Sequence, residues 1–297
     1  MKTMSVMLRR NIKLFFKDKG MFFTSLITPI ILLVLYATFL GNVYRDSFTA
    51  NLPEFVTISD SLLDALVGGQ LISSILSVSC ITVAFSSNFL MVQDKANGSI
   101  KDLSISPVKS SLLSMSYYFA TIISTLIVCF SAMAICLGYV ATVGWYMSFV
   151  DVLMLLIDVV VLVLLGTAVS SVINFFLSSQ GQIAAVGSIV SSGYGFICGA
   201  YMPISTFSEG LQKALSFFPG TYGTSLVRTH AMRGAFAELE SQNIPAEVVD
   251  SIKAALDCNM SFFDKEVSVP AMYIVLGASA VVFGVAYILM NKYKKAK

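Results

Sequence analysis

Eighteen mostly polar residues, QDKANGSIKDLSISPVKS at positions 93–110, interrupt an otherwise apolar sequence. Four of their five charges are suited to ion pairs with another protein: Asp94, Lys95, Lys101 and Asp102. The segment also carries apolar residues that a solvated loop would not need and that could pack into a groove of a partner: Ile100, Leu103 and Ile105. The pattern favours a docking segment over an ordinary loop.

Asp158 is the one carboxylate well inside an apolar stretch, VLMLLIDVVVLVLLG. A charge in a bilayer is costly unless it is paired or protonated, so such a residue is a functional candidate by default. A lone acid makes a poor proton relay, however, and a structural hydrogen bond to a neighbouring helix or dipping loop explains it better. If Asp158 is charged, we expect Arg228 or Arg233 as its partner.

The sequence has no other constellation typical of catalysis or metal binding. GxxxxGK[ST], GxSxG and HExxH are absent, so we expect no catalytic residues, no metal and no cofactor in this chain itself. His230 is the only histidine, which argues against a histidine-based metal site within one chain. Four cysteines in apolar stretches are best interpreted as small buried hydrophobes: Cys80, Cys129, Cys136 and Cys198. Cys258 is either a free thiol or part of an intermolecular bridge.

Long apolar helices must position these residues. Of 297 residues, 56% are hydrophobic and 12% are charged, against about 25% charged in a soluble domain. Stretches long enough to cross a bilayer lie at 21–41, 64–92, 112–140, 150–174, 181–203 and 269–291. They are too long and too continuously apolar for barrel strands, so we predict an all-α polytopic membrane protein with six spans. The first stretch is also too long for a signal peptide and lacks a cleavage site.

Thirteen of the 19 Lys and Arg residues lie in the N-terminal segment, the 93–110 segment and the C-terminus. Because basic residues accumulate on the cytoplasmic side, we expect both termini and the 93–110 segment to be cytoplasmic, and 204–268 to be external. The net charge of +2 gives no indication of nucleic-acid binding.

Amphipathic segments accompany the spans. Residues 2–19 place apolar side chains at helical spacing with basic residues opposite, which is typical of a helix in the membrane interface. Residues 203–233 contain two half-length amphipathic helices divided by Pro219-Gly220, and we interpret them as a re-entrant hairpin in the outer leaflet. Residues 235–268 are expected to form an external cap.

Three details of these external segments can be tested against a structure. Thr206 and Glu209 have the spacing of a capping box at the start of the first half-helix. The second half-helix is expected from about Tyr222 to Met232. A cap helix is expected over residues 245–256.

Two stripes of small residues run along the second and fifth predicted spans. On the second, helical spacing puts Gln70, Ser73 and Ser77 on one face. On the fifth, four residues follow at intervals of four: Gly187, Ser191, Gly195 and Gly199. Such a face either packs tightly against another helix, from this or a second copy of the chain, or lines a polar pathway. Both interpretations are compatible with the sequence.

Short motifs recur in a fixed order along the chain. After the second span they read Asp94-Lys95, Gly98-Ser99-Ile100 and Ser106-Pro107-Val108. After the fifth they read Gly199-Ala-Tyr-Met-Pro203, Pro219-Gly-Thr-Tyr222 and Ser225-Leu-Val-Arg228. In order and spacing they resemble the ABC-2-type permease, the membrane subunit of an ATP-binding-cassette exporter with the type V exporter fold. This chain departs from the family pattern in having Asp94 for the usual Glu and in a longer insertion at 235–268.

The resemblance implies one transmembrane domain over residues 1–297 and a separate ATPase subunit that binds ATP and Mg. In the family, the 94–104 region is a coupling helix seated in the ATPase, and its movement switches the spans between inward and outward access. The matching residues here are Asp94, Lys95, Gly98, Ile100, Lys101, Asp102, Leu103 and Pro107.

On this basis we expect a homodimer of permease subunits, bound to two ATPase subunits, among the lipids of a bacterial inner membrane. The expected pathway lies between the first, second and fifth spans and is lined by Gln70, Ser73, Ser77, Ser191, Gly195 and Gly199. The expected external gate consists of Pro203, Phe217, Phe218, Pro219, Tyr222 and Arg228. An apolar, weakly polar lining favours outward transport of a hydrophobic or amphipathic compound, such as a drug, a lipid-like molecule or a small peptide.

Three alternatives stay open. A polysaccharide or teichoic-acid exporter of the same fold would use aromatic rings along its pathway, such as Tyr194, Phe196 and Tyr201. A sodium exporter would require Asp158. A membrane anchor or sensor would bind a partner without transport.

Overall fold

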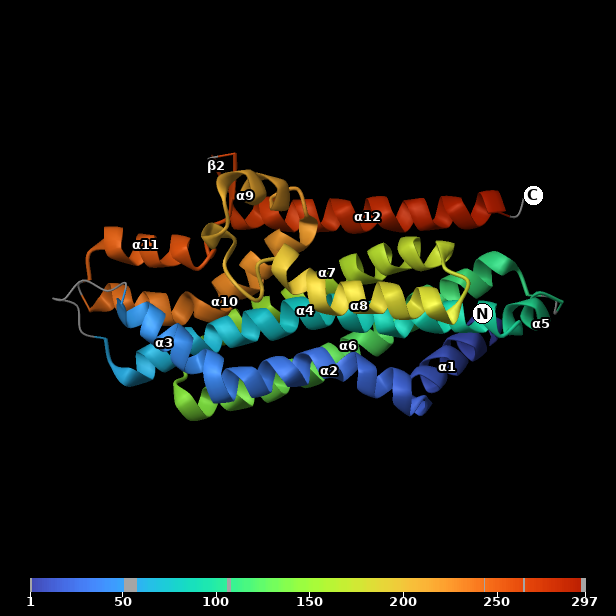
Figure 1. Ribbon diagram of the computed structural model, residues 1–297, viewed down its shortest axis with the longest axis horizontal. Helices are drawn as coiled ribbons and strands as arrows, with labels where there is room; N and C mark the ends of the chain where they lie inside the picture. The colour runs from blue at the N-terminus through green and yellow to red at the C-terminus, as the bar shows by residue number, and fades with distance from the viewer. Residues whose placement is uncertain (1, 51–57, 106–107, 243, 264, 295–297) are drawn as a thin grey trace.

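The protein is an elongated bundle of helices (Figure 1). The computed structural model describes residues 2–50, 58–105, 108–242, 244–263 and 265–294. Within these ranges the chain is almost entirely helical, with a single two-stranded sheet, which confirms an all-α polytopic architecture. Both chain ends lie at the end of the bundle that carries α5 (Ser99–Ile105), as Figure 1 shows.

Five helical segments are long and apolar enough to cross a membrane: Lys19–Asp46, Asp60–Ala96, Ser111–Val143, Phe149–Phe176 and Val269–Tyr293. The first combines α2 (Lys19–Leu35), a π-helical turn (Tyr36–Leu40) and α3 (Gly41–Ala50). The others correspond to α4 (Asp60–Ala96), α6 (Ser110–Val143), α7 (Phe149–Phe176) and α12 (Val269–Lys294). They match the first, second, third, fourth and sixth predicted spans.

The predicted fifth span, 181–203, is a shorter helix. It forms α8 (Gln180–Ile197), whose 18 residues reach about 27 Å, slightly less than the roughly 30 Å of a hydrocarbon core. Its glutamine, glycine and serine residues also lower its hydropathy. The count of six spans is therefore not confirmed.

Helix α4 forms the centre of the bundle. It contacts α2, α6, α7, α8 and α10 (Pro219–Ser241), and 94% of its most apolar window is buried, against 17% for α12. Lipid or a partner must cover the apolar residues of α12, whereas the protein itself covers α4. Burial on all sides explains why small residues are spread around α4, since they let five helices approach it.

The amphipathic N-terminal segment is helix α1 (Lys2–Lys17). Two residues of its apolar side, Met7 and Phe15, are buried in one cluster with Leu113 and Tyr117 of α6. This side of α1 therefore lies on the protein. Its position in a membrane interface stays a prediction.

The structure corrects two details of the hairpin predicted over residues 203–233. Helix α9 (Glu209–Leu215) begins after Ser208, and Thr206 ends a separate 3₁₀ turn (Ile204–Thr206), so the expected capping box does not form. Pro219 does begin a second helix, where its missing N–H costs no hydrogen bond. That helix, α10, does not stop at Met232 but continues to Ser241, because α4, α7 and α12 pack along it.

Beyond α10 the chain forms a small cap. Helix α11 (Ala246–Ala255) matches the cap helix expected over 245–256. A hairpin of β1 (Ser261–Phe262) and β2 (Lys265–Glu266), not predicted, then leads into α12. In Figure 1 this hairpin and α9 lie beside the beginning of α12.

Candidate functional sites

Asp94 fastens the beginning of the polar segment to two other helices. Only 6% of Asp94 is exposed, and Arg10 of α1 donates to its carboxylate at 2.8 and 3.3 Å. Tyr117 of α6 donates to the same carboxylate at 2.5 Å. Hydrogen bonds with an ionised partner are the stronger kind. One carboxylate thus joins α1, α4 and α6.

Lys95, the next residue, fastens the segment to α7. Its ammonium donates to the carbonyl oxygens of Asn174, Phe175 and Leu177 at 3.1, 2.9 and 3.2 Å. Carbonyls at the end of a helix lack N–H partners and carry the negative end of the helix dipole, so a cation stabilises them. The structure therefore corrects the expectation that Asp94 and Lys95 pair with another protein. Both charges bind within this chain.

The short helix α5 follows this base. Gly98 turns the chain into it with a φ of +79°, in the left-handed region that glycine tolerates best. Ile100 and Leu103 are partly buried against the cluster of α1, α4 and α6, and their contact with a partner's groove stays a prediction. Ile105 is 84% exposed.

Of the other predicted coupling residues, Asp102 is exposed on α5 and Lys101 lies on the same helix. Pro107 falls outside the described residues. The surface that α5 can offer to a partner is therefore smaller than the sequence indicates, and it includes Asp102 and Ile105.

The stripe on α4 does not line a pathway in this chain. Gln70, Ser73 and Ser77 are each 0% exposed. Ser73 accepts a hydrogen bond from Arg228 at 3.3 Å. Among the described residues, neither the Gln70 amide nor the Ser77 hydroxyl has a hydrogen-bond partner. The prediction that these three residues face a pathway is corrected, because neighbouring helices cover all of them.

Gly195 and Gly199 serve a turn of the chain itself. The N–H of Ala200 bonds the carbonyl of Gly195 at 2.8 Å, and Gly199, with a φ of +72°, bonds Phe196 at 3.3 Å. These are the two bonds of a Schellman motif, which ends α8. A Cβ on Gly195 would lie 2.3 Å from the ring of Tyr201. Gly195 therefore leaves room for the side chain of Tyr201, which follows in the same chain, and not for another helix as predicted.

The other half of that stripe does line a groove. It lies between α2, α4 and α8 and has a volume of about 540 Å³. Gly187 and Ser191 lie on its α8 wall, Thr24 and Thr28 on the α2 wall, and Thr82 on α4. These are the three spans expected to surround the pathway, although Ser191 alone of the predicted lining residues takes part.

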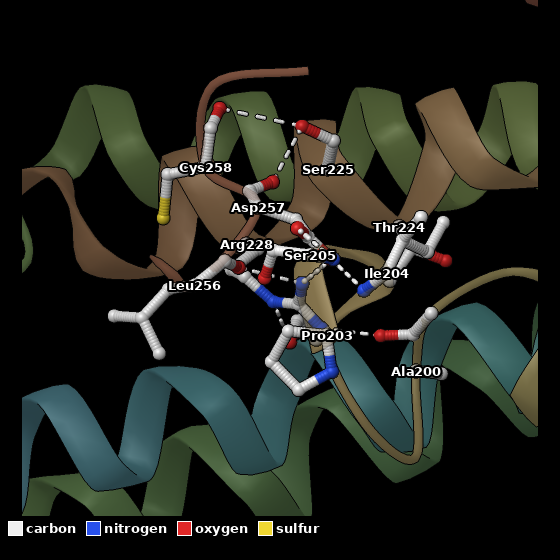
Figure 2. A network of polar contacts seen from close by, with 12 residues as sticks. Ala200, Pro203, Ile204, Ser205, Thr224, Ser225, Arg228, Leu256, Asp257 and Cys258 are labelled. Carbon is white, nitrogen blue, oxygen red and sulfur yellow. Dashed lines mark hydrogen bonds and ion pairs between the residues drawn. The ribbon is translucent and has the colours of Figure 1, made fainter. Parts of the chain in front are cut away.

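Arg228 joins α4 to the cap that contains α11 (Figure 2). It is 0% exposed and donates to the carbonyls of Leu256 at 2.6 Å and Gly199 at 2.7 Å. Both carbonyls belong to the terminal turns of helices, α11 and α8, where the helix dipole favours a cation. One side chain therefore connects α4, α8, α10 and α11.

Asp257 completes this network. Its carboxylate lies 3.6 Å from the Arg228 guanidinium and accepts hydrogen bonds from the backbone N–H groups of Ile204 and Ser205. Burial raises the pKa of Asp257, while Arg228 and the two N–H groups act in the opposite direction. Asp257 thus holds the turn before α9 against the cap, as Figure 2 shows.

The structure divides the predicted gate residues into two groups. Phe217 and Phe218, between α9 and α10, are 64% and 49% exposed. Phe217 meets the rings of Phe262 and Phe263 of the hairpin edge-on. Pro203 and Pro219 are half-buried. Tyr222 is buried and donates to the Ser216 carbonyl at 2.7 Å, so, like Arg228, it supports the fold.

Asp158 is buried and has two partners, neither of them predicted. One oxygen lies 2.7 Å from Nδ1 of His230 on α10, and Tyr273 of α12 donates to the other. Arg228 lies in the network above, and Arg233 pairs with Asp151 at 2.5 Å. The expectation of an arginine partner was wrong. The structural role is favoured over a sodium site, because both carboxylate oxygens already have protein partners.

Cys258 is 4% exposed, and burial raises the pKa of its thiol to about 12. The thiol is therefore protonated at neutral pH, and its burial favours the free thiol over an intermolecular bridge. The four other cysteines are also buried and free.

These features define a class of protein: a multi-pass α-helical membrane protein with a fastened polar segment at one end and a closed cap at the other. The sequence profile of the ABC-2 type transporter family matches residues 3–231, and the chain belongs to that family. It is thus a permease subunit of an ABC transporter, a membrane component that requires an ABC ATPase partner. A comparison with curated proteins gives no match.

Proposed function

We propose that the chain is one of two identical permease subunits of an exporter in a bacterial inner membrane, with both termini in the cytoplasm. Two ATPase subunits, which bind ATP and Mg, dock on α5 as the coupling helix. The observation that carries this proposal is the fastening of the end of α4, directly before α5, where Asp94 and Lys95 connect it to α1, α6 and α7.

This fastening suits the transmission of movement. Close-packed elements transmit displacement because they have few ways to deform. A push on α5 reaches α1 through Arg10, α6 through Tyr117 and the end of α7 through the carbonyls around Lys95. The helices at this end are therefore expected to move together when the ATPase subunits close.

The groove between α2, α4 and α8 is our candidate for the substrate pathway. Hydroxyl groups of Thr28 and Ser86 alternate on its walls with apolar side chains such as Phe85 and Val190. A mixed lining of this kind suits an amphipathic compound better than a bare ion or a highly charged glycan. The second copy of the chain would close the open side of the groove.

Co-purification tests the docking site. The chain is extracted from its native membranes in mild detergent as wild type, Ile105→Asp and Phe149→Asp. Ile105 and Phe149 are 84% and 83% exposed, and Phe149 begins α7, at the opposite end of the bundle. We expect an ATPase with the wild type and with Phe149→Asp, and its loss with Ile105→Asp.

Two results would oppose the proposal. Retention of the ATPase by Ile105→Asp would contradict docking through α5. Absence of any ATPase from the intact wild-type protein would favour a membrane anchor or sensor.

A further inference from the structure

The groove between α2, α4 and α8 presents one negative charge. Asp18, which precedes α2, lies at its end nearest α1 and is exposed. Among the described residues that line the groove, Asp18 is the only ionisable one. Lys17 and Lys19 flank Asp18 in the sequence, but both are exposed and neither lines the groove. An anionic head group at this end of the groove would meet the Asp18 carboxylate.

Three of the six hydroxyl groups that line the groove donate their proton within their own helix. Thr24 donates its only proton to the Gly20 carbonyl at 2.6 Å, and Thr82 donates to Val78 at 3.0 Å. Ser191 donates to its own helix in the same way, at 3.2 Å. A hydroxyl that has given its proton to the backbone keeps only lone pairs for a ligand. These three groups therefore favour a ligand that brings its own N–H or O–H groups.

Away from Asp18 the lining of the groove is mixed, with apolar side chains between the hydroxyl groups. From Asp18 to Thr28 the wall extends by about 15 Å of helix. Ile27, Phe85 and Val190 line this deeper part. A polar head beside Asp18 and an apolar tail along these side chains would fill the groove.

We propose that this groove binds amphiphiles whose head group is a protonated amine. This inference rests on the proposed function, because it takes the groove as the entrance for the transported substrate. The Asp18 carboxylate is the counter-charge. One of its oxygens accepts the N–H of Met21 at 3.0 Å and caps α2, while a carboxylate has room for further donors.

Binding to the purified full-length chain, in nanodiscs of phosphatidylcholine and without ATP, tests this proposal. The probes are three pyrene-labelled amphiphiles with one tail and an ammonium, hydroxyl or carboxylate head. We expect the ammonium probe to bind about fivefold or more tightly than the carboxylate probe. Equal affinities, or a preference for the carboxylate, would overturn the proposal.

Asp18→Asn isolates the charge, because asparagine caps a helix as well as aspartate does. In Asp18→Asn we expect the affinity for the ammonium probe to fall to the affinity for the hydroxyl probe. The affinity for the hydroxyl probe should not change. Asp46→Asn removes an exposed acid from the far end of the same span and should change neither affinity. An unaltered ammonium preference in Asp18→Asn would contradict the proposal.

Two adjacent alanines of α8 test the location. Both are exposed, but Ala184 lines the groove and Ala185 does not. Ala184→Phe should abolish binding of every probe and Ala185→Phe should not, whereas equal effects would place the binding site elsewhere.

Nanodiscs that contain phosphatidylethanolamine identify the source of the amine. Competition with the ammonium probe would assign the site to a membrane lipid, and its absence would assign it to a soluble amphiphile. Because no ATPase takes part, failure of these binding tests leaves the proposed permease function standing. Failure of co-purification, in turn, leaves the binding result unaffected.

Discussion

Two charge networks lie along the two halves of the central helix α4, and they are built differently. In the half nearer the cap, which is the outer end in the proposed orientation, Arg228 is 0% exposed and donates to two backbone carbonyls. At the inner end, the partners of Asp94 are the side chains of Arg10 and Tyr117, and 30% of the Arg10 side chain is exposed.

The difference indicates where the molecule can move. A fully buried charge held by backbone carbonyls leaves its position only at a large desolvation cost. A pair of side chains beside water can lengthen or exchange for water at a small cost. We therefore expect the cap and the outer end of α8 to move as one body, and the helices around α5 to change their relative positions.

The largest effect is expected from Arg228→Met. It leaves the Asp257 carboxylate and two carbonyls without their cation in a buried place, which costs about 3–5 kcal/mol. Unfolding of the purified protein by denaturant in detergent measures the change. Arg45→Met removes a partly exposed cation from an outer ion pair and should cost about 1 kcal/mol or less. Equal costs would remove the distinction between the networks.

A second test distinguishes the effect of burial on stability from the effect of having backbone carbonyls as partners. Asp158 is buried like Arg228, but its partners are side chains, His230 and Tyr273. Asp158→Asn keeps the volume and disturbs two buried hydrogen bonds, so we expect a loss of about 2 kcal/mol in the same unfolding experiment. A loss as large as that of Arg228→Met would show that burial alone makes a network rigid.

The inner network is expected to affect coupling more than stability. Asp94→Asn retains a hydrogen-bond acceptor but removes the buried charge opposite Arg10, at a cost of about 1.5 kcal/mol in stability. Substrate-stimulated ATP hydrolysis by the complex should nevertheless fall several-fold, while the ATPase still co-purifies. Asp102→Asn, an exposed change on α5, serves as the control for loss of charge alone. Unchanged stimulation in Asp94→Asn would contradict a coupling role for the inner network.

The smallest effect on stability is expected at the gate. Phe217 is 64% exposed, so Phe217→Ala should change the free energy of unfolding by about 0.5 kcal/mol or less. If Phe217 belongs to the external gate, outward transport in vesicles should still change. Tyr222→Phe removes a buried hydrogen bond, so it should lower stability by about 1 kcal/mol and leave transport unchanged. Loss of stability without any change in transport in Phe217→Ala would remove this residue from the gate.

Apolar length predicted the spans well, since a bilayer requires it, but it could not predict what covers each helix. Gln70 and Ser191 belong to similar stripes, yet one is enclosed by helices and the other faces a groove. Periodicity identifies a face and not its neighbour. For the same reason the predicted second arm of the hairpin ended too early, because protein contacts rather than composition extend α10 to Ser241.

The partners of the charged residues were the least predictable part. Arg10 lies 84 positions from Asp94, and His230 lies 72 positions from Asp158. Nothing local in the sequence relates such pairs. The single histidine was a usable signal, because an imidazole is a natural partner for the one carboxylate inside a predicted span.

Movement of α5 driven by ATP tests the central claim most directly. Spin labels on Ile105→Cys report the distance between the two copies in the complex with its ATPase, before and after ATP and Mg are added. The native thiols are buried and should not react. A second pair of labels, on Ser205→Cys and Ser251→Cys of one subunit, reports on the outer body. The account predicts that the distance between the Ile105→Cys labels shortens with ATP, while the distance between the Ser205→Cys and Ser251→Cys labels stays constant. An Ile105→Cys distance that does not change with ATP would contradict the account.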